Sequence, residues 1–311
     1  MFISVGVPTC NRPHDLDRCL ASLAKLAYAN WRLMVIDQSD DEQTRAIVEA
    51  WSTRIQALAY VRLKQKNASA ARNLAISEAE GDILAFLDDD CTVSADWLDR
   101  ISEAFVRQPE ASLIFGNVTA ADHDPSATFI PTYEVQHEMR IRGSTGALRV
   151  HAMGAATYVR LAWARQSSFD VGLGPGSRFR TSEDWDYAYR LLAAGGVIVA
   201  TPRIVVTHHG ARSYSAGAAT LLLRDYFYGI GADHAKLLRC GDWIMVAVII
   251  DKLARSISLI RPHKALVHQP TQFGRLLMYV RGLRDGSRAP IDRQKGLFQT
   301  GPSSLGTGAH S

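Results

Sequence analysis

The chain contains little cysteine, and its cysteines form no recognisable metal or disulfide pattern. None of the four lies in a CxxC pair or has a histidine at zinc spacing: Cys10, Cys19, Cys91 and Cys240. This excludes a zinc ribbon and a disulfide framework, and it is typical of reduced, intracellular proteins. The sequence also lacks an internal repeat.

No stretch is apolar for long enough to span a bilayer, which takes about 18 residues. The longest apolar run, WIMVAVII at 243–250, is flanked by Asp242 and Asp251, and we interpret it as a buried or interfacial helix. The first residues, MFISVGVPTCNRP, lack the basic start of a signal peptide. We therefore expect a cytoplasmic protein, free or at the inner face of the cell membrane.

Charge is unevenly distributed along the chain. Residues 211–311 contain fourteen Lys and Arg against six Asp and Glu, a net charge of +8 in a chain whose total is +4. Residues 1–210 are therefore acidic overall, and the two parts are expected to have different roles. The basic part contains no motif that reads nucleic acid, so we expect no nucleic acid partner.

Short apolar runs alternate with helical patterns over the first 120 residues. Because these runs are apolar almost throughout, they predict an α/β fold with a mainly parallel sheet flanked by helices on both faces. The expected strands are 2–7, 32–37, 59–63, 82–87 and 112–118, and the expected helices are 14–25, 41–52, 70–79 and 95–107. Ligands bind beyond the carboxyl ends of such strands, where Asp37 and residues 88–90 fall.

The second part of the sequence is less regular. Residues 119–180 show no clear periodicity, whereas residues 181–196 predict a helix capped by Thr181 or Ser182, and 197–210 an extended segment. Residues 211–285 predict a basic, amphipathic helical extension. Residues 286–311 contain GSRAPIDRQKG and GPSSLGTGAHS, and we predict a disordered tail there.

The stretch FLDDDC, 86–91, places Asp88, Asp89 and Asp90 directly after an apolar strand. Their mutual repulsion and loss of solvation would be relieved by a divalent cation, and Mg²⁺ or Mn²⁺ prefers such oxygen ligands. The same ion could hold a diphosphate. A solvated acidic turn is the alternative.

Two further stretches carry chemistry that fits such a site. Glu183 and Asp184 open a predicted helix, where a carboxylate is favoured in its charged form and can accept a proton. Helix capping is the alternative explanation for these acids. His208 and His209 end an extended segment and could complete a metal site, or they could simply be exposed polar residues.

Together these stretches resemble bacterial members of glycosyltransferase family 2, which have the GT-A fold and use nucleotide-sugar donors. The resemblance covers roughly residues 2–215 and rests on motifs in the family's order: SVGVPTCNRP, MVIDQSDD, SAARNLAI, GDILAFLDDDC and SEDWDYAYRL. It implies a catalytic domain over 1–210, with a nucleotide-sugar half at 1–118 and an acceptor half at 119–210.

The resemblance also implies a role for individual residues. The donor-binding residues are Pro8, Thr9, Asn11, Arg12, Asp37, Arg72, Asp88 and Asp89. Asp90 and His208 are the implied ligands of Mg²⁺ or Mn²⁺, and Asp184 is the implied catalytic base. The acceptor-side residues are Gly154, Glu183, Trp185 and Arg190.

Two positions depart from the family pattern. Asn67 stands where a glycine usually precedes the ARN block, and asparagine tolerates left-handed backbone better than most residues. Ala156 stands where an asparagine is usual, so one substrate contact is missing from the pattern. Neither departure touches the acidic motifs.

The resemblance implies an inverting transfer of sugar from a nucleotide diphosphate, with UDP favoured, to a hydroxyl of a glycan or lipid-linked acceptor in polysaccharide biosynthesis. Two alternatives stay open. One is a catalytically silent glycan-binding or scaffold protein. The other is a sugar-phosphate nucleotidyltransferase, although VPTCNRP has little of the glycine that its phosphate loop needs.

The basic extension has two interpretations. One is peripheral contact with an anionic membrane, because apolar residues at helical spacing stand beside Lys252, Arg255, Arg261 and Lys264. The other is packing on the catalytic domain or a homodimer through these helices. Arg224, Tyr226 and Tyr228 either line the acceptor cleft or, for the tyrosines, belong to the core.

Overall fold

We describe a computed structural model of the chain over residues 1–299, apart from 144, 147–148, 150–152 and 259–271. Its centre is a nine-stranded sheet with the order β3-β2-β1-β4-β9-β6-β10-β5, in which β8 also pairs with β10. The strands are β1 (Ile3–Thr9), β2 (Trp31–Asp37), β3 (Leu58–Arg62), β4 (Ile83–Phe86), β5 (Cys91–Val93), β6 (Leu113–Ala120), β8 (Met139–Arg142), β9 (Thr157–Arg160) and β10 (Val197–His208).

The first four strands in that order are parallel, and helices cover both of their faces. The helices of this part are α1 (Pro13–Leu23), α2 (Gln43–Trp51), α3 (Ala68–Glu78) and α4 (Trp97–Arg107). One core cluster joins alternate residues of β1, such as Val5, to Leu20 of α1, and a second joins Ile36 of β2 to Ala75 of α3. The expected α/β fold with a mainly parallel sheet is confirmed.

Residues 119–180 contain more structure than the sequence indicates. Strand β9 is inserted antiparallel between β4 and β6, and β8 pairs antiparallel with β10. A two-residue strand, β7 (Thr128–Phe129), pairs with β11 (Arg212–Ser213). A 3-10 turn at Gly154–Ala156 and the short helix α5 (Leu161–Ala164) flank β9. The expectation of an irregular segment is therefore corrected.

Helix α6 (Glu183–Ala193) follows, as the sequence predicts, but its cap differs from the expectation. Ser182 occupies the N-cap position in left-handed backbone, with φ 80°, and makes no side-chain cap hydrogen bond. Its hydroxyl instead donates to Asp233 Oδ2 at 2.8 Å. The side chain is thus used for a tertiary contact.

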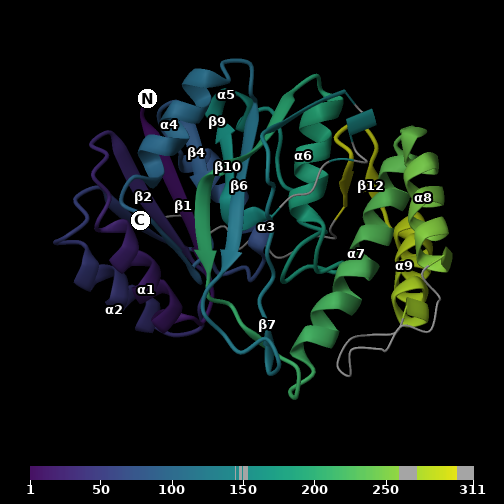
Figure 1. Cartoon of the computed structure of the whole chain (residues 1–311), viewed down its shortest axis with the longest axis horizontal. Helices are drawn as coiled ribbons and strands as arrows, with labels where there is room; N and C mark the ends of the chain where they lie inside the picture. Colours follow the sequence, from purple (N-terminus) through teal and green to yellow (C-terminus); the bar gives the residue numbers. More distant parts are fainter. Residues whose placement is uncertain (144, 147–148, 150–152, 259–271, 300–311) are drawn as a thin grey trace, which may run out of the picture.

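Three helices form the C-terminal extension: α7 (Ala218–Arg239), α8 (Ile244–Ser258) and α9 (Gln272–Arg288). Figure 1 shows them on the side of the sheet opposite α1 and α2, with α6 between. Glycines let α7 and α9 approach closely, because a Cβ on Gly231 would collide with the Tyr279 carbonyl oxygen and one on Gly282 with that of Tyr228. Among the residues that the structure describes, no helix combines the length and apolarity needed to cross a membrane.

The predicted disordered tail is wrong for its first part. After α9 the chain forms a hairpin of β12 (Ile291–Asp292) and β13 (Leu297–Phe298). Phe298 is buried beside Phe179, and its backbone N–H donates to Asp170 Oδ2 at 2.9 Å. This apolar anchor orders a segment whose composition indicates disorder. Residues 300–311 lie outside the described residues.

A buried lysine ties the extension to residues 1–210. Lys236 Nζ of α7 lies 2.8 Å from Asp170 Oδ2, 2.5 Å from Asp186 Oδ1 and 3.2 Å from Asp233 Oδ1. All four side chains are fully buried. Because a buried charge is costly without partners, this cluster holds α7 against α6.

Candidate active site

A cleft of about 720 Å³ lies beyond the carboxyl ends of β1 and β4 and is bounded by the start of α6 and by α7. Twelve of the residues predicted for the site line it: Pro8, Thr9, Arg12, Arg72, Asp88, Asp89, Asp90, Gly154, Glu183, Asp184, Trp185 and His208. These residues come from distant parts of the sequence, so the fold brings the donor, metal and acceptor sides of the prediction into one cavity.

Asp89 turns toward the start of the chain. Its Oδ2 accepts a hydrogen bond from Thr9 Oγ1 at 2.7 Å, and its Oδ1 lies 3.1 Å from Arg12 Nη1. Burial raises the pKa of Asp89 to about 7, against the opposing attraction of Arg12. Asp89 therefore fixes the turn after β1 to the acidic segment.

Asp90 pairs with His208 in the lining of the cleft. Strand β5 pairs antiparallel with β10, placing Cys91 opposite His208, and His208 Nε2 lies 3.3 Å from Asp90 Oδ1. Burial alone would raise the pKa of Asp90, but the hydrogen bond and charge of His208, with Arg12, lower it to about 2. The pKa of His208 is raised, since the attraction of Asp90 outweighs burial.

These residues fit a divalent cation. Ligand atoms of Asp90, Cys91 and His208 all lie within 4.8 Å of one another. The His208 Nδ1 contacts the Pro131 carbonyl oxygen at 3.0 Å, which aims Nε2 at Asp90. Burial raises the pKa of the Cys91 thiol well above its usual range, so the hard oxygen and imidazole donors suit Mg²⁺ or Mn²⁺.

Gly210 is required beside this pair. A Cβ on it would lie 2.6 Å from His208 Nε2 and would collide with Asp90 Oδ2.

Since Asp89 and Asp90 are only 4% and 3% exposed, the alternative of a solvated acidic turn is wrong.

Arg72 of α3 stands at the centre of a second group of carboxylates. Its Nη2 lies 3.3 Å from Asp88 Oδ1, and its Nη1 lies 3.0 Å from Glu183 Oε1 and 3.4 Å from Asp184 Oδ1. Burial lowers the pKa of Arg72, but attraction by Asp184, Asp88 and Glu183 outweighs it and leaves the group charged. Arg72 thus connects the segment after β4 to the start of α6.

Asp184 is held in one orientation with acceptor capacity left over. Its Oδ2 accepts a hydrogen bond from the Gly154 N–H at 2.8 Å. Its Oδ1 is buried and accepts no hydrogen bond from any residue that the structure describes. A Cβ on Gly154 would lie 2.8 Å from both Asp184 oxygens and would collide with Arg72. Asp184 lines the cleft with 20% of its side-chain surface exposed, so its carboxylate can accept a proton from a hydroxyl group there.

Glu183 is less available than Asp184. It is 6% exposed, and its Oε1 is occupied by Arg72 at 3.0 Å. Burial and the nearby charge of Asp184 raise the pKa of Glu183 to about 7, against the attraction of Arg72. Its position favours a role in holding Arg72. Both acids stand in the first turn of α6, as helix capping requires, and both also reach Arg72, which capping alone does not explain.

Comparison with known proteins decides the family. Residues 4–160 match the family described as Glycosyl transferase family 2. The succinoglycan biosynthesis protein ExoM of Rhizobium meliloti is 33% identical over 250 residues, which are 76% of this chain and 75% of that protein. The chain belongs to glycosyltransferase family 2. The predicted family is confirmed.

Two further relatives define how far the likeness extends. WfgD of Escherichia coli, named a UDP-Glc:alpha-D-GlcNAc-diphosphoundecaprenol beta-1,3-glucosyltransferase, is 32% identical over 117 residues, 37% of this chain and 45% of that protein. The structure of Staphylococcus aureus TarS 1-349 with UDP-GlcNAc aligns at a TM-score of 0.57 with 18% identity, covering 74% of this chain and 65% of that one. The chain thus spans just under two thirds of the TarS fragment, whose likeness concerns the fold.

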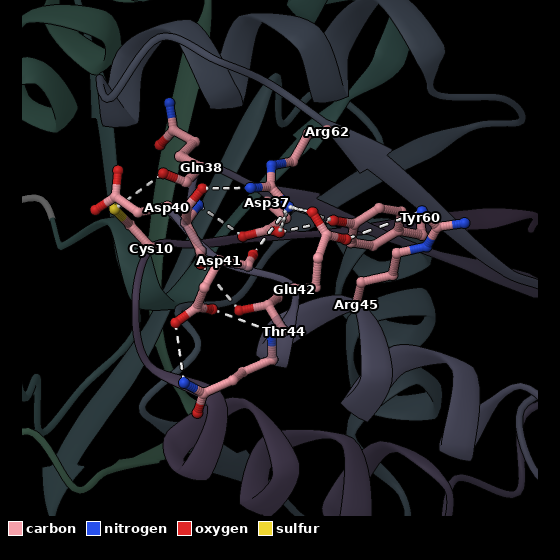
Figure 2. Close-up of polar contacts among 12 residues, drawn as sticks. Cys10, Asp37, Gln38, Asp40, Asp41, Glu42, Thr44, Arg45, Tyr60 and Arg62 are labelled. Carbon is pink, nitrogen blue, oxygen red and sulfur yellow. Dashed lines mark hydrogen bonds and ion pairs between the residues drawn. The ribbon is translucent and has the colours of Figure 1, made fainter.

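Three of the predicted site residues do not line the cleft of this family 2 enzyme. Asp37 is fully buried, and its oxygens accept hydrogen bonds from Ser39 N at 2.8 Å and Tyr60 Oη at 2.7 Å, with Arg62 Nη1 at 3.2 Å (Figure 2). These bonds hold the loop after β2. Contact of Asp37 with the nucleotide stays a prediction.

Asn11 and Arg190 also point elsewhere. Asn11 is exposed and exchanges hydrogen bonds with Asp40, donating from Nδ2 at 2.9 Å and accepting from Asp40 N at 2.8 Å. Arg190 donates to Asp186 Oδ2 at 2.7 Å from Nη2 and to Ser167 Oγ at 2.9 Å from Nη1. It therefore supports α6, and its acceptor-side role stays a prediction.

The structure shows where the two residues that depart from the family pattern lie. Asn67 has extended backbone, with φ −157°, and caps α3 by accepting from Ala70 N at 2.8 Å. Its tolerance of left-handed backbone is therefore not what is used. Ala156 is buried in the 3-10 turn before β9.

The wall of the cleft formed by α7 was predicted only in part from the sequence. Helix α7 contributes four apolar or aromatic residues to the lining: Leu222, Leu223, Tyr226 and Ile230. Of the two tyrosines considered at the sequence level, Tyr226 lines the cleft, whereas Tyr228 hydroxyl donates to Asp285 at 3.1 Å and packs against Phe179. No motif marks this wall, because it depends on how α7 packs on the catalytic part.

Proposed function

We propose that this family 2 glycosyltransferase is a metal-dependent, inverting enzyme of polysaccharide biosynthesis. The observation that carries the proposal is Asp184. Its position is fixed by Gly154 N–H, it lines the cleft with 20% of its side chain exposed, and it shares Arg72 with Asp88 of the acidic segment. We therefore expect the catalytic base and the diphosphate site on opposite sides of the sugar's anomeric carbon, whose bond to the diphosphate breaks in the transfer.

The donor is proposed to be a UDP-sugar. Support comes from the donor in the name of WfgD and from the UDP-GlcNAc complex of TarS. Asp90 and His208 would hold Mg²⁺ or Mn²⁺, which when bound neutralises the diphosphate and assists its departure. Arg12, bonded to Asp89 and Asp90, keeps the two carboxylates in place for it.

The acceptor is proposed to be a hydroxyl of a glycan or a lipid-linked glycan. Asp184 takes the hydroxyl proton while the oxygen attacks the anomeric carbon on the face opposite the leaving diphosphate, so that one displacement inverts the configuration. As in glycoside hydrolysis, the transition state has oxocarbenium character. Trp185 and the α7 residues of the cleft provide apolar surface on this side. The names of ExoM and WfgD support a polysaccharide or diphospho-lipid acceptor.

Calorimetric titration tests the proposal at its metal site. UDP, dTDP and GDP are titrated with and without Mn²⁺ into the wild type, Asp90→Ala and the control Glu103→Ala, whose exposed acid on α4 lies outside the cleft. We expect one nucleotide to bind only with Mn²⁺, and only to the wild type and the control.

Two results would count against it. Binding of a nucleotide that is equally tight without Mn²⁺ would indicate a metal-independent transferase. The absence of binding for all three nucleotides would favour the silent glycan-binding or scaffold protein. A nucleotidyltransferase is disfavoured because residues 10–12 between β1 and α1, CNR, contain no glycine.

A further inference from the structure

The extension exposes a group of large apolar side chains on two neighbouring helices. We call this the outer face; its members are Trp243, directly before α8, Val246 and Ile250 of α8, and Phe273, Leu277 and Val280 of α9. Their exposed fractions run from 39% for Val246 to 76% for Trp243. Isolated exposed apolar residues are ordinary, but a group of six on adjoining helices indicates a contact surface.

The spacing shows that each helix has already buried its other side. In α8, Met245 and Val248 pack against Tyr189 and Leu237. In α9, Tyr279 is fully buried, and Gly282 meets the backbone of α7. The outer-face residues follow at intervals of three and four, so they lie on the opposite side of each helix. The outer-face side chains are therefore not needed for packing within the extension.

Along α9, exposed basic side chains follow the apolar residues of the outer face. Helix α9 contains four arginines and one aspartate, and Arg281, Arg284 and Arg288 are exposed. By helical periodicity, Arg284 and Arg288 follow Leu277 and Val280 along the same side. Asp285 pairs with Arg284 at 3.0 Å and with Arg281 at 3.8 Å, which leaves this end positive. A second copy would present the same net charge, whereas an anionic lipid surface would neutralise it.

We propose that the outer face docks on a membrane surface that contains anionic lipids. The apolar side chains enter the boundary between headgroups and acyl chains, and the arginines of α9 contact lipid phosphates. Figure 1 shows α8 and α9 at the edge of the molecule farthest from β2, so that the sheet does not cover them.

Helix α8 also contacts the cleft rim, on the side of the helix away from the outer face. Lys252 Nζ of α8 is 5.9 Å from the ring centre of Tyr226, and Tyr226 lines the cleft while 43% exposed. A membrane docked on the outer face would lie on the other side of α8 from this contact. The docking does not depend on the proposed function.

Co-sedimentation with vesicles tests the proposal on the full chain. Vesicles of phosphatidylglycerol and phosphatidylethanolamine are compared with vesicles of phosphatidylcholine alone, at low and high salt. We expect binding to the anionic vesicles that weakens with salt. Ile250→Ser combined with Phe273→Ser should weaken it by at least about tenfold, and Arg284→Ser by about fivefold. Val106→Ser is the matched control, since Val106 is 65% exposed on α4, and should leave binding unchanged.

Trp243 supplies a second readout, because it is 76% exposed in the free protein. On docking, its fluorescence should move to shorter wavelength, and Trp243→Phe should remove that shift while the protein still sediments. Failure to bind anionic vesicles, or equal binding by Ile250→Ser/Phe273→Ser and the wild type, would overturn the proposal. A dimer in solution that this double variant converts to monomer would assign the face to a second copy and would overturn it as well.

Discussion

The chain gathers three carboxylates around a buried cation at two places, and the two clusters differ in their access to water. The cleft cluster is Arg72 with Asp88, Glu183 and Asp184; Asp88 and Asp184 keep 31% and 20% of their side-chain surface exposed. The closed cluster is Lys236 with Asp170, Asp186 and Asp233, all fully buried.

The two clusters share one helix and one electrostatic pattern. Asp184 and Asp186 are two residues apart at the start of α6, so they point to different sides. Burial raises the pKa of carboxylates in both: in the cleft cluster that of Asp88, and that of Glu183 to about 7, and in the closed cluster that of Asp233 to about 8. What separates them is the opening: the cleft cluster can exchange a proton with a ligand, whereas the closed cluster can only hold two parts of the fold together.

The largest effect is expected from a matched pair of substitutions on α6. Asp184→Asn keeps the size and the acceptor for Gly154 N–H but removes the base, so transfer should fall by about 10²–10⁴-fold while nucleotide binding and thermal stability persist. Asp186→Asn makes the same chemical change at the closed cluster. It should lower the unfolding temperature and leave transfer by the folded fraction largely intact. Sugar transfer and calorimetric melting of both variants check this.

The opposite pattern would break the comparison. Near-normal turnover by Asp184→Asn would remove Asp184 from the role of base. Loss of turnover in Asp186→Asn without loss of stability would place the closed cluster in the chemistry.

The next effect concerns stability alone. Lys236→Met removes the cation from three buried carboxylates and should cost about 3–5 kcal/mol in the free energy of unfolding. Lys295→Met, which alters an exposed lysine in the turn between β12 and β13, is the control and should cost little. Denaturant unfolding measures both. A cost for Lys236→Met below about 1 kcal/mol would mean that the carboxylates share a proton or are reached by water, contrary to the buried geometry.

The same contrast explains which parts the sequence could predict. The cleft cluster was predictable, because Asp88, Glu183 and Asp184 stand in local motifs whose order along the chain resembles a family. Strands such as β1 and β4 were predictable because both their faces are buried, which leaves a continuous apolar run. Periodicity and motif are local signals, and these features are local.

The closed cluster was not predictable, because its members are scattered through the sequence. Lys236 looks like one more basic residue of the extension until α7 is placed against Asp170 and Asp186. Likewise, nothing beside Asp37 indicates that Tyr60 and Arg62 of the next strand occupy its oxygens. Strand β9 is only four residues long and gives no alternation to detect. These features depend on tertiary contacts.

The smallest expected effect lies at the connection between the clusters. Ser182 stands directly before the acidic pair of α6, has φ 80°, and donates to Asp233 Oδ2 at 2.8 Å. Left-handed backbone costs a non-glycine residue roughly 1–2 kcal/mol, so Asp233 holds the start of α6 in a conformation that serine alone would avoid. Asp184 is thereby positioned from the closed cluster.

Two substitutions separate the hydrogen bond from the backbone strain. Ser182→Ala and Ser182→Gly both remove the hydroxyl, but only glycine adopts this φ freely, so Ser182→Gly should be more stable than Ser182→Ala by about 1 kcal/mol. Both should lower turnover more than nucleotide affinity, because the hydroxyl fixes the base and touches no donor-binding residue. Denaturant unfolding measures the difference in stability, and single-turnover transfer measures the loss of turnover. Equal stability of the pair would show that the backbone at Ser182 relaxes once the bond is lost, and unchanged turnover in both would disconnect the clusters.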